Sequence, residues 1–511
     1  MSFMRAPTAD ELQVYNEKYG FGCDLKELEE YSELLKESVK GLQAMYLTPE
    51  PALPVKYPRT PGYRPVGDEN KHNAWYWKCD IQGAPAGKLQ GKTVGVKDTV
   101  FVAGVPMMNG SRLLEGFVPE YDATIVTRLL DEGAQIIGKT TCEDLCFSGG
   151  SFLTSYGPVR NPWNTKHSAG GSSSGSGVVV ATGEVDLAIG GDQGGSIRIP
   201  SAQCGIVGLK PTHGLVPYTG ICSIDYSLDH IGPMARTVTD CALMLEVMAG
   251  FDDHNDPRQP STGFPSRTYT STLQDSVKHL RIGVLKEAFG GPVTDEVKTT
   301  VQNAIEQIKL DRSFASVAEV SAPHHPLATA AVMAVILNSP NQSVDGSFCG
   351  GLQSGQLSEA VFRGLKTNAQ SLSISIKMCG MFAAYIREKY GLGSYAKAQS
   401  LVVQHRRLYD NLFENVDLLV MPTVPCVGAM LPDENTSITE RIHRAFGVVN
   451  NTAPFNGTHH PALTLNAGYS SENLPIGLQI VGRRWNDDVV LQAAYAIEKA
   501  LKPLQREFKS D

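Results

Sequence analysis

Ser196 follows two glycines in the segment 192–200, shortly after an apolar run at residues 185–189. That run is broken only by Asp186 and predicts a buried strand, while Pro200 is typical of the first turn of a helix. A serine at a strand-to-helix turn can attack a carbonyl carbon, and backbone N–H groups of the turn can stabilise the oxyanion that forms. An ordinary glycine turn whose serine caps the helix is the alternative, and this segment alone leaves both open.

Two upstream segments carry groups that could assist such a serine. The run 170–177 contains only glycine and serine, although strongly patterned segments flank it on both sides. Residues 93–96 predict a short buried strand that ends at Lys97. Lysine is almost never fully buried without a reason, and burial disfavours its charged form. Lys97 is therefore a candidate proton acceptor.

Together, three segments resemble the signature blocks of the amidase signature family of serine hydrolases, namely 95–98, 170–177 and 192–200. The blocks occur in the order of the family, and Ser196 follows Ser172 by 24 positions. Just before the serine, Gly191-Asp192-Gln193 stands where Thr-Asp-Thr is commoner in the family. This variant resembles the bacterial amidases that are often found beside nitrile hydratases.

The resemblance assigns Ser196 as the nucleophile, Ser172 as a bridging serine and Lys97 as the base. It also implies a cis peptide bond before Ser172. The assignment is chemically consistent, because a hydroxyl both donates and accepts and can pass a proton from the nucleophile to a neutral amine. The oxyanion hole would consist of the backbone N–H groups of Gln193, Gly194, Gly195 and Ser196.

Other residues around these blocks are expected to support the site or to contact the substrate. Asp192 and Arg198 flank the nucleophile and are interpreted as support for the turn, and Gly171 is the small residue before the bridging serine. Phe147 is either part of an acyl pocket or an ordinary core phenylalanine. By resemblance, the residues that approach the substrate are Phe147, Ser148, Gly149 and, less specifically, Asn450.

Composition excludes several other classes of function. The net charge of −8 and the absence of a Lys/Arg cluster argue against a nucleic-acid partner. Ten cysteines in 511 residues are too sparse for a disulfide scaffold, and no His or Cys spacing resembles a zinc site. No cofactor or metal is expected. The longest apolar run, 327–337, is too short to span a bilayer, and the N-terminus does not resemble a signal peptide, so we expect a cytoplasmic protein.

Strands that alternate with helices predict an α/β fold, a large mixed β-sheet with helices on both faces. We expect a helical extension and proline-rich connector at 1–85 and a catalytic domain at 86–505. A variable insert at about 251–395 is expected to form one wall of the substrate pocket. The apolar stripe of the helix after Asp24 must pack on either the main domain or a second subunit, and we predict that it packs in a homodimer.

Three rival interpretations remain. The segment 171–175 also fits the G-x-S-x-G elbow of α/β-hydrolases with Ser173 as nucleophile, although no strand is predicted directly before it. A Cys-Glu-Lys amide hydrolase would use Cys146 or Cys204, without support from a second motif. The third interpretation is a noncatalytic subunit that binds a ligand with its glycine loops. It is weakened because this sequence has no G-K-[ST] after the glycine loop.

The expected function is hydrolysis of small to medium aliphatic or aromatic carboxamides through an acyl-serine intermediate. Within the family, hydrolysis of hydrazides, esters or anilides stays open. A component of a tRNA-dependent amidotransferase is less expected, because the helical N-terminal extension differs from such a protein. The only reaction partners expected are a small amide and water.

Overall fold

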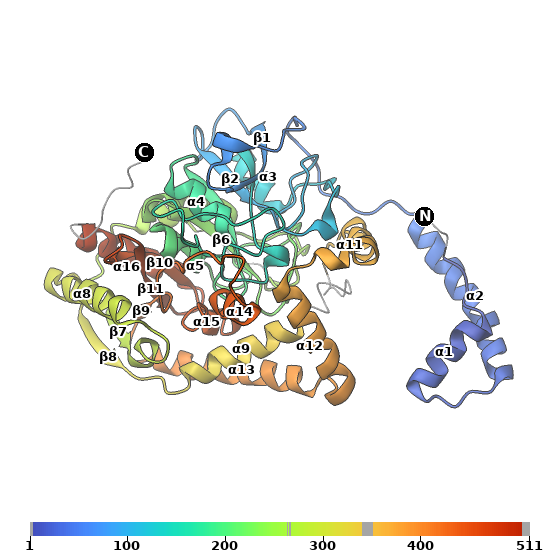
Figure 1. Ribbon diagram of the computed structural model, residues 1–511. Coiled ribbons are helices and arrows are strands. Elements are labelled where there is room, and N and C mark those ends of the chain that lie inside the picture. The colour runs from blue at the N-terminus through green and yellow to red at the C-terminus, as the bar shows by residue number, and fades with distance from the viewer. Residues whose placement is uncertain (1–3, 263, 265–266, 340–350, 503–511) are drawn as a thin grey trace. The chain divides into compact units, whose positions relative to one another are not determined.

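The computed structural model describes residues 4–262, 264, 267–339 and 351–502. The chain forms two compact units, one that ends at Ala52 and one that begins at Leu53 (Figure 1). None of the described helices combines the length and the apolar character that a membrane span requires.

The first unit is a pair of helices, α1 (Ala9–Tyr19) and α2 (Leu25–Leu47). Each begins with a capping box, in which the side chain of Thr8 or Asp24 accepts from the backbone N–H of a glutamate three residues later. The helix that the sequence predicts after Asp24 is therefore confirmed. Leu28 is buried, but much of the apolar surface of α2 is exposed, including Leu25 at 61%.

The second unit contains a mixed sheet of eleven strands in the order β1-β3-β2-β4-β6-β5-β10-β11-β9-β7-β8. Strand β2 runs parallel to both β3 and β4, and β7 runs parallel to β8 and β9, whereas the remaining pairs are antiparallel. The strands are β1 (Trp75–Gln82), β2 (Thr93–Lys97), β3 (Gln135–Thr140), β4 (Leu187–Asp192), β5 (Val207–Lys210), β6 (His230–Ala235), β7 (Arg281–Leu285), β8 (Ser316–Val320), β9 (Leu418–Pro422), β10 (Ala462–Tyr469) and β11 (Pro475–Gly482).

Helices cover both faces of this sheet, as the sequence predicts. Successive side chains of a strand point to opposite faces. Leu187 and Ile189 of β4 belong to one core cluster with residues of α3 and α6, whereas Ala188 between them belongs to another with residues of α4. The helices of this unit include α3 (Thr124–Asp131), α4 (Ser174–Ala181), α5 (Arg198–Cys204), α6 (Val238–Met248), α7 (Tyr269–Thr272), α8 (Asp295–Asp311), α9 (His325–Asn338), α11 (Gly355–Asn368), α12 (Ile374–Tyr390), α13 (Gly393–Leu412), α14 (Ile438–Phe446), α15 (Ala453–Gly457) and α16 (Asp487–Leu501).

The large unit begins earlier than residue 86, where the sequence places the start of the catalytic domain. Strand β1, which the sequence leaves in the connector, pairs antiparallel with β3 at the edge of the sheet. Two aromatic side chains at its start, Trp75 and Tyr76, are buried, so the aromatic cluster anchors this segment as a strand.

The topology brings the ends of two strands together. Strands β2 and β4 are parallel neighbours, with Val96 opposite Ile189, so their carboxyl ends lie at the same edge of the sheet. Lys97 is the last residue of β2 and Asp192 the last residue of β4. In open α/β sheets, ligands bind outside the carboxyl ends of the strands.

Candidate functional site

Lys97 is fully buried and lies against the glycine-serine run. Its Nζ atom donates a hydrogen bond to Ser172 Oγ at 2.9 Å and another to the carbonyl oxygen of Gly191 at 3.3 Å. Within the described residues Lys97 forms no ion pair. Its hydrogen-bond partners at these distances are thus a hydroxyl and a carbonyl oxygen rather than a carboxylate, and the Cys146 thiol also interacts with this amine.

A second buried lysine nearby has a different environment. Lys139 on β3 forms an ion pair with Asp98, with 2.9 Å between Nζ and Oδ1. Asp98 also accepts from the backbone N–H of Met108 at 2.9 Å. Asp98 therefore compensates the charge of Lys139 and also binds the backbone of the loop after β2.

The segment that carries Ser172 is tied to the end of β4. The peptide bond between Gly171 and Ser172 is cis, as the resemblance implies. Ser173 Oγ donates to the carbonyl oxygen of Gly191 at 3.1 Å and accepts from its N–H at 3.2 Å, while the Ser173 N–H donates to the carbonyl oxygen of Ser196 at 3.3 Å. These bonds tie the residue after Ser172 to the end of β4 and to the backbone of Ser196. Ser173 directly precedes α4, and its hydroxyl is hydrogen-bonded to backbone atoms of Gly191. It does not follow a strand, whereas the nucleophile of the hydrolase elbow does.

Ser196 lies in the turn between β4 and α5 and lines a small cavity of about 30 Å³. Its side chain forms no hydrogen bond with Ser172 in the described part of the chain. Likewise, the N–H groups of Gly194, Gly195 and Ser196 donate to no other described residue. Such catalytic hydrogen bonds often form only when substrate is bound, and unengaged donors are what an oxyanion hole requires.

Gly195 is the position in this turn where only glycine fits. Its φ angle is +141°, a region that other residues rarely adopt. A Cβ atom there would lie 2.3 Å from Thr452 Oγ1, and that hydroxyl donates to the carbonyl oxygen of Gly194 at 2.7 Å. The segment after α14 therefore packs directly on the turn and holds its shape.

A buried ion pair fixes the base of the turn. Arg198 donates to both carboxylate oxygens of Asp192, from Nη2 at 2.9 Å and from Nε at 3.0 Å, and both side chains are fully buried. Burial opposes ionisation of Asp192, but the Arg198 charge and hydrogen bonds from Arg198 and Asn456 outweigh it and lower its pKa to about 2. Arg198 Nη1 also donates to Gln479 Oε1 at 2.8 Å. Both side chains lie at the base of the turn, and neither is on the cavity wall.

Most residues that were expected to contact substrate line the cavity beside Ser196. Phe147, Ser148 and Gly149 are on its wall, but Asn450 is not, and its neighbour Val449 takes that place. Sequence reasoning did not single out the remaining wall residues, of which two belong to α9 and so to the predicted variable insert. These residues are Ile199, Ile224, Met333, Ile336 and Phe446, whereas Cys146, which is also on the wall, is the candidate nucleophile of a rival interpretation.

The two candidate cysteine nucleophiles differ in position. Cys204 is buried away from the cavity, where its thiol lies 3.4 Å from the carbonyl oxygen of Ala169 and burial raises its pKa. Cys146 lines the cavity. A hydrogen bond from Cys142 and the charge of Lys97 outweigh burial and lower the Cys146 pKa to about 6. Only Cys146 is therefore placed where a nucleophilic thiol could act.

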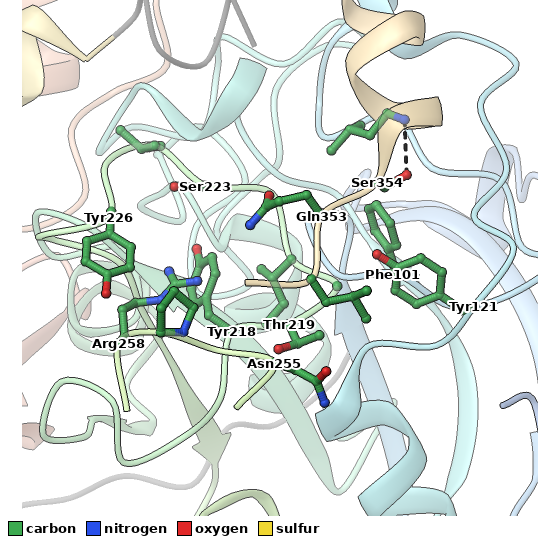
Figure 2. Close-up of a pocket in the computed structure, with 16 residues that line it drawn as sticks. Phe101, Tyr121, Tyr218, Thr219, Ser223, Tyr226, Asn255, Arg258, Gln353 and Ser354 are labelled. Atoms are coloured by element: carbon green, nitrogen blue, oxygen red, sulfur yellow. Dashed lines mark hydrogen bonds between the residues drawn. The ribbon is translucent and has the colours of Figure 1, made fainter. Parts of the chain in front are cut away.

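A second cavity, of about 50 Å³, lies next to the first, and Ile224 borders both. Figure 2 shows that Tyr218, Tyr226 and Arg258 form one side of it. Arg258 lies over the Tyr218 ring, with 4.3 Å from Cζ to the ring centroid. Across residues 4–262, 264, 267–339 and 351–502, no group of three or more His, Cys, Asp or Glu side chains is arranged to hold a metal ion.

This chain resembles known proteins both in sequence and in fold. A family model described as Amidase matches residues 64–491. An enantioselective amidase from Rhodococcus rhodochrous is 41% identical over 98% of this chain and 97% of its own length. One component of the glutamyl-tRNA(Gln) amidotransferase from Methanosarcina mazei is 35% identical over 91% of this chain and 95% of its own. The X-ray structure of peptide amidase from Stenotrophomonas maltophilia superposes with a TM-score of 0.67 at 28% identity, covering 82% of this chain and 84% of that one.

Proposed function

The chain belongs to the amidase family and is an amidase, a hydrolase that acts on C–N bonds, and we propose that its substrates are small to medium aliphatic or aromatic carboxamides. The products are the carboxylic acid and ammonia. We propose further that Ser196, Ser172 and Lys97 carry the reaction through an acyl-serine intermediate.

In acylation, Ser196 Oγ attacks the carbonyl carbon of the amide. Ser172 accepts the Ser196 proton and passes its own proton to the neutral amine of Lys97. The negative charge moves to the carbonyl oxygen, where N–H groups of the turn stabilise it; losing one such donor typically costs about 2.7–4 kcal/mol. The proton then returns through Ser172 to the amide nitrogen, the C–N bond breaks, and ammonia leaves.

In deacylation, the same groups act on water. Ser172 and Lys97 accept a proton from a water molecule as its oxygen attacks the acyl carbon. The ester bond to Ser196 breaks, and the proton returns to Ser196 Oγ as the carboxylic acid leaves. The three side chains, the N–H groups of the turn and the attacking water together account for every proton that moves.

The observation that carries the proposal is the 2.9 Å contact between the buried Lys97 Nζ and Ser172 Oγ. The substrate class is supported by the cavity wall, which is small and largely apolar around Ser196. A wall of this kind favours apolar acyl groups of limited size.

The variant Ser196→Ala tests the mechanism directly. We expect it to lose amide turnover and covalent labelling by a fluorophosphonate probe, because no other hydroxyl in the turn replaces Oγ. Mass spectrometry of the labelled wild-type protein should place the adduct on Ser196. Normal turnover by the Ser196→Ala variant would contradict the assignment.

Cys146 is the second candidate nucleophile, because it lines the same cavity and has a lowered pKa. The serine mechanism predicts that Cys146→Ala keeps fluorophosphonate labelling at Ser196, and that wild-type turnover is indifferent to metal chelators. Loss of labelling with an acyl adduct found on the Cys146 thiol of the wild type would favour the cysteine instead.

The likeness to a component of an amidotransferase leaves a further alternative, in which the amide nitrogen is transferred rather than released. Free ammonia formed from a simple carboxamide by the purified chain supports hydrolysis. The cytoplasmic location and the homodimer stay predictions from the sequence.

A further inference from the structure

Gln193 carries a side chain of which only one end has a partner. The residue is 3% exposed and lines the cavity beside Ser196. Its Nε2 atom donates to the Tyr218 hydroxyl at 2.7 Å. Its Oε1 atom is buried and has no hydrogen-bond partner among the described residues. A buried carbonyl oxygen without a hydrogen-bond partner is costly in free energy and rare, so such a group calls for an explanation.

The hydrogen bonds of the Tyr218 hydroxyl determine whether the NH2 group or the oxygen of the Gln193 amide faces it. Tyr218 donates its proton to the carbonyl oxygen of Cys222 at 3.2 Å, and a carbonyl oxygen cannot donate in return. The hydroxyl is then left as an acceptor, so the amide NH2 of Gln193 must face it. Oε1 consequently remains the free end of a side chain on the cavity wall.

Tyr218 is itself held firmly. The guanidinium of Arg258 stacks on its ring, as Figure 2 shows, and Arg258 forms ion pairs with Asp256 at 2.8 Å and Asp229 at 3.3 Å. Two fixed neighbours, one on the ring and one at the hydroxyl, leave Tyr218 little freedom to rotate. The orientation of Gln193 is therefore built into the fold before any substrate binds.

We propose that Gln193 Oε1 accepts a hydrogen bond from an N–H of the scissile carboxamide and thereby selects amides over esters. The inference rests on the proposed function, because it places the scissile group beside Ser196. A carboxamide offers an N–H donor that satisfies Oε1. An ester offers only oxygen lone pairs at the corresponding position, so the buried acceptor stays unpaired and faces a like dipole.

This contact also acts on the leaving group. An N–H bonded to Oε1 restricts rotation about the C–N bond of the tetrahedral intermediate. That restriction favours the orientation in which the nitrogen lone pair can take the returning proton. Gln193 is thus a specificity residue of the same turn whose backbone is proposed to bind the oxyanion.

The test is the ratio of kcat/KM for benzamide to kcat/KM for methyl benzoate in the variant Gln193→Met. Methionine has a similar length but no carbonyl oxygen, and the intrinsic reactivities of the two substrates cancel when the ratio is compared with that of the wild type. We expect the amide-to-ester ratio to fall about 10- to 100-fold. Equal changes for both substrates would overturn the inference.

Gln203 offers a matched control. It is 2% exposed, its Oε1 is also unpaired among the described residues, and it does not line this cavity. Gln203→Met should therefore leave the amide-to-ester ratio at the wild-type value. A fall as large as that of Gln193→Met would assign the effect to general loosening of the fold and would overturn the inference.

Tyr218→Phe tests the positioning step, since it removes the hydroxyl that binds Nε2 and leaves the ring. We expect the ratio to fall in this variant, by less than in Gln193→Met, because Gln193 can then rotate. An unchanged ratio would refute the anchoring role of Tyr218. The proposed function has a separate test: if wild-type protein hydrolyses neither substrate, or if labelling is not at Ser196, the mechanism fails regardless of Gln193.

Discussion

At the scale of single residues, the site depends on the difference between two buried lysines. Lys139 has a carboxylate partner, Asp98, whereas Lys97 contacts a hydroxyl and a carbonyl oxygen. Removing a charged amine from water costs free energy, and an adjacent carboxylate compensates for that cost. Lys97 has no carboxylate partner among the described residues, and the proposed proton transfer requires its amine to be neutral.

Substitution of Lys97 tests this requirement. We expect Lys97→Met to lower kcat/KM about 10²- to 10⁴-fold, the usual contribution of a general base. Lys97→Arg should not restore activity, because a guanidinium keeps its proton in proteins. The measurement is turnover of benzamide, with thermal unfolding as the check that both variants fold. Activity of Lys97→Arg close to the wild-type value would contradict the base assignment.

The shape of the nucleophile turn gives a second prediction at this scale. Gly195→Ala would add a Cβ atom 2.3 Å from Thr452 Oγ1 at a φ angle of +141°. Since neither the backbone nor Thr452 can yield without moving the turn, we expect loss of most amide turnover. Gly91→Ala is a suitable control, because no atom lies within 4 Å of its added Cβ, although its φ of +78° carries some strain.

At the scale of elements, the turn between β4 and α5 is held by a pair of charges without access to water. Arg198 joins the end of β4 to the segment 452–456 and to Gln479 of β11. Segments that are distant in the chain therefore converge on the serine turn. Its conformation depends on tertiary contacts as well as on the glycines.

Removing one partner of this pair should be costly. Arg198→Met leaves Asp192 buried and uncompensated, and we expect it to lower the free energy of unfolding by about 3–5 kcal/mol, as measured by chemical denaturation. The exposed pair of Lys309 and Glu306 on α8, 2.6 Å apart, provides the comparison. Lys309→Gln should change stability by about 0–1 kcal/mol, and a similar loss in both variants would refute the argument from burial.

At the scale of the whole molecule, buried histidines couple stability to pH. His460 is fully buried, and burial lowers its pKa to about 4, although Asp410 opposes the shift. The unfolded chain binds this proton near pH 6.5 and the folded chain only near pH 4. The contribution of neutral His460 to stability is therefore complete above about pH 6.5 and is lost as the pH falls towards 4.

The variant His460→Gln isolates this contribution from that of the other titrating groups. We expect the wild type to exceed the variant in stability at about pH 8, and the difference to shrink by up to about 1.4 kcal/mol for each pH unit between about 6.5 and 4. Chemical denaturation at about pH 8 and about pH 5 measures it. The exposed His279 is the control, and a His279→Gln difference that shrinks equally would contradict the assignment to His460.

The homodimer is also a prediction at this scale. Within the helical pair 9–47, apolar side chains are exposed, among them Tyr31 at 44% and Leu42 at 43%, and we predict that a second copy of the chain covers them. We expect the full-length chain to elute as a dimer, and a chain lacking residues 1–47 to elute as a monomer in size-exclusion chromatography with light scattering. An unchanged oligomeric state after truncation would rule out this interface.

Local sequence pattern was sufficient to predict the α/β class, several elements and the candidate catalytic groups, because none of these requires knowledge of distant contacts. Apolar runs such as 93–96 predicted buried strands, and Asp24 marked the start of a predicted helix. The resemblance of the glycine and serine blocks to the amidase signature blocks, in order and spacing, made Ser172 and Ser196 the candidate catalytic serines.

The three-dimensional packing decided which side chains come into contact at the candidate site. The apolar run 327–337 has no polar face, so its sequence does not indicate that Met333 and Ile336 are the residues of α9 that line the cavity. The free end of Gln193 depends on the hydroxyl of Tyr218, which lies 25 positions later in the chain. The pairing of Lys139 rather than Lys97 with Asp98 depends on the register of β2 and β3. Contacts of this kind arise from packing across the sheet, whereas periodicity and spacing record only neighbours along the chain.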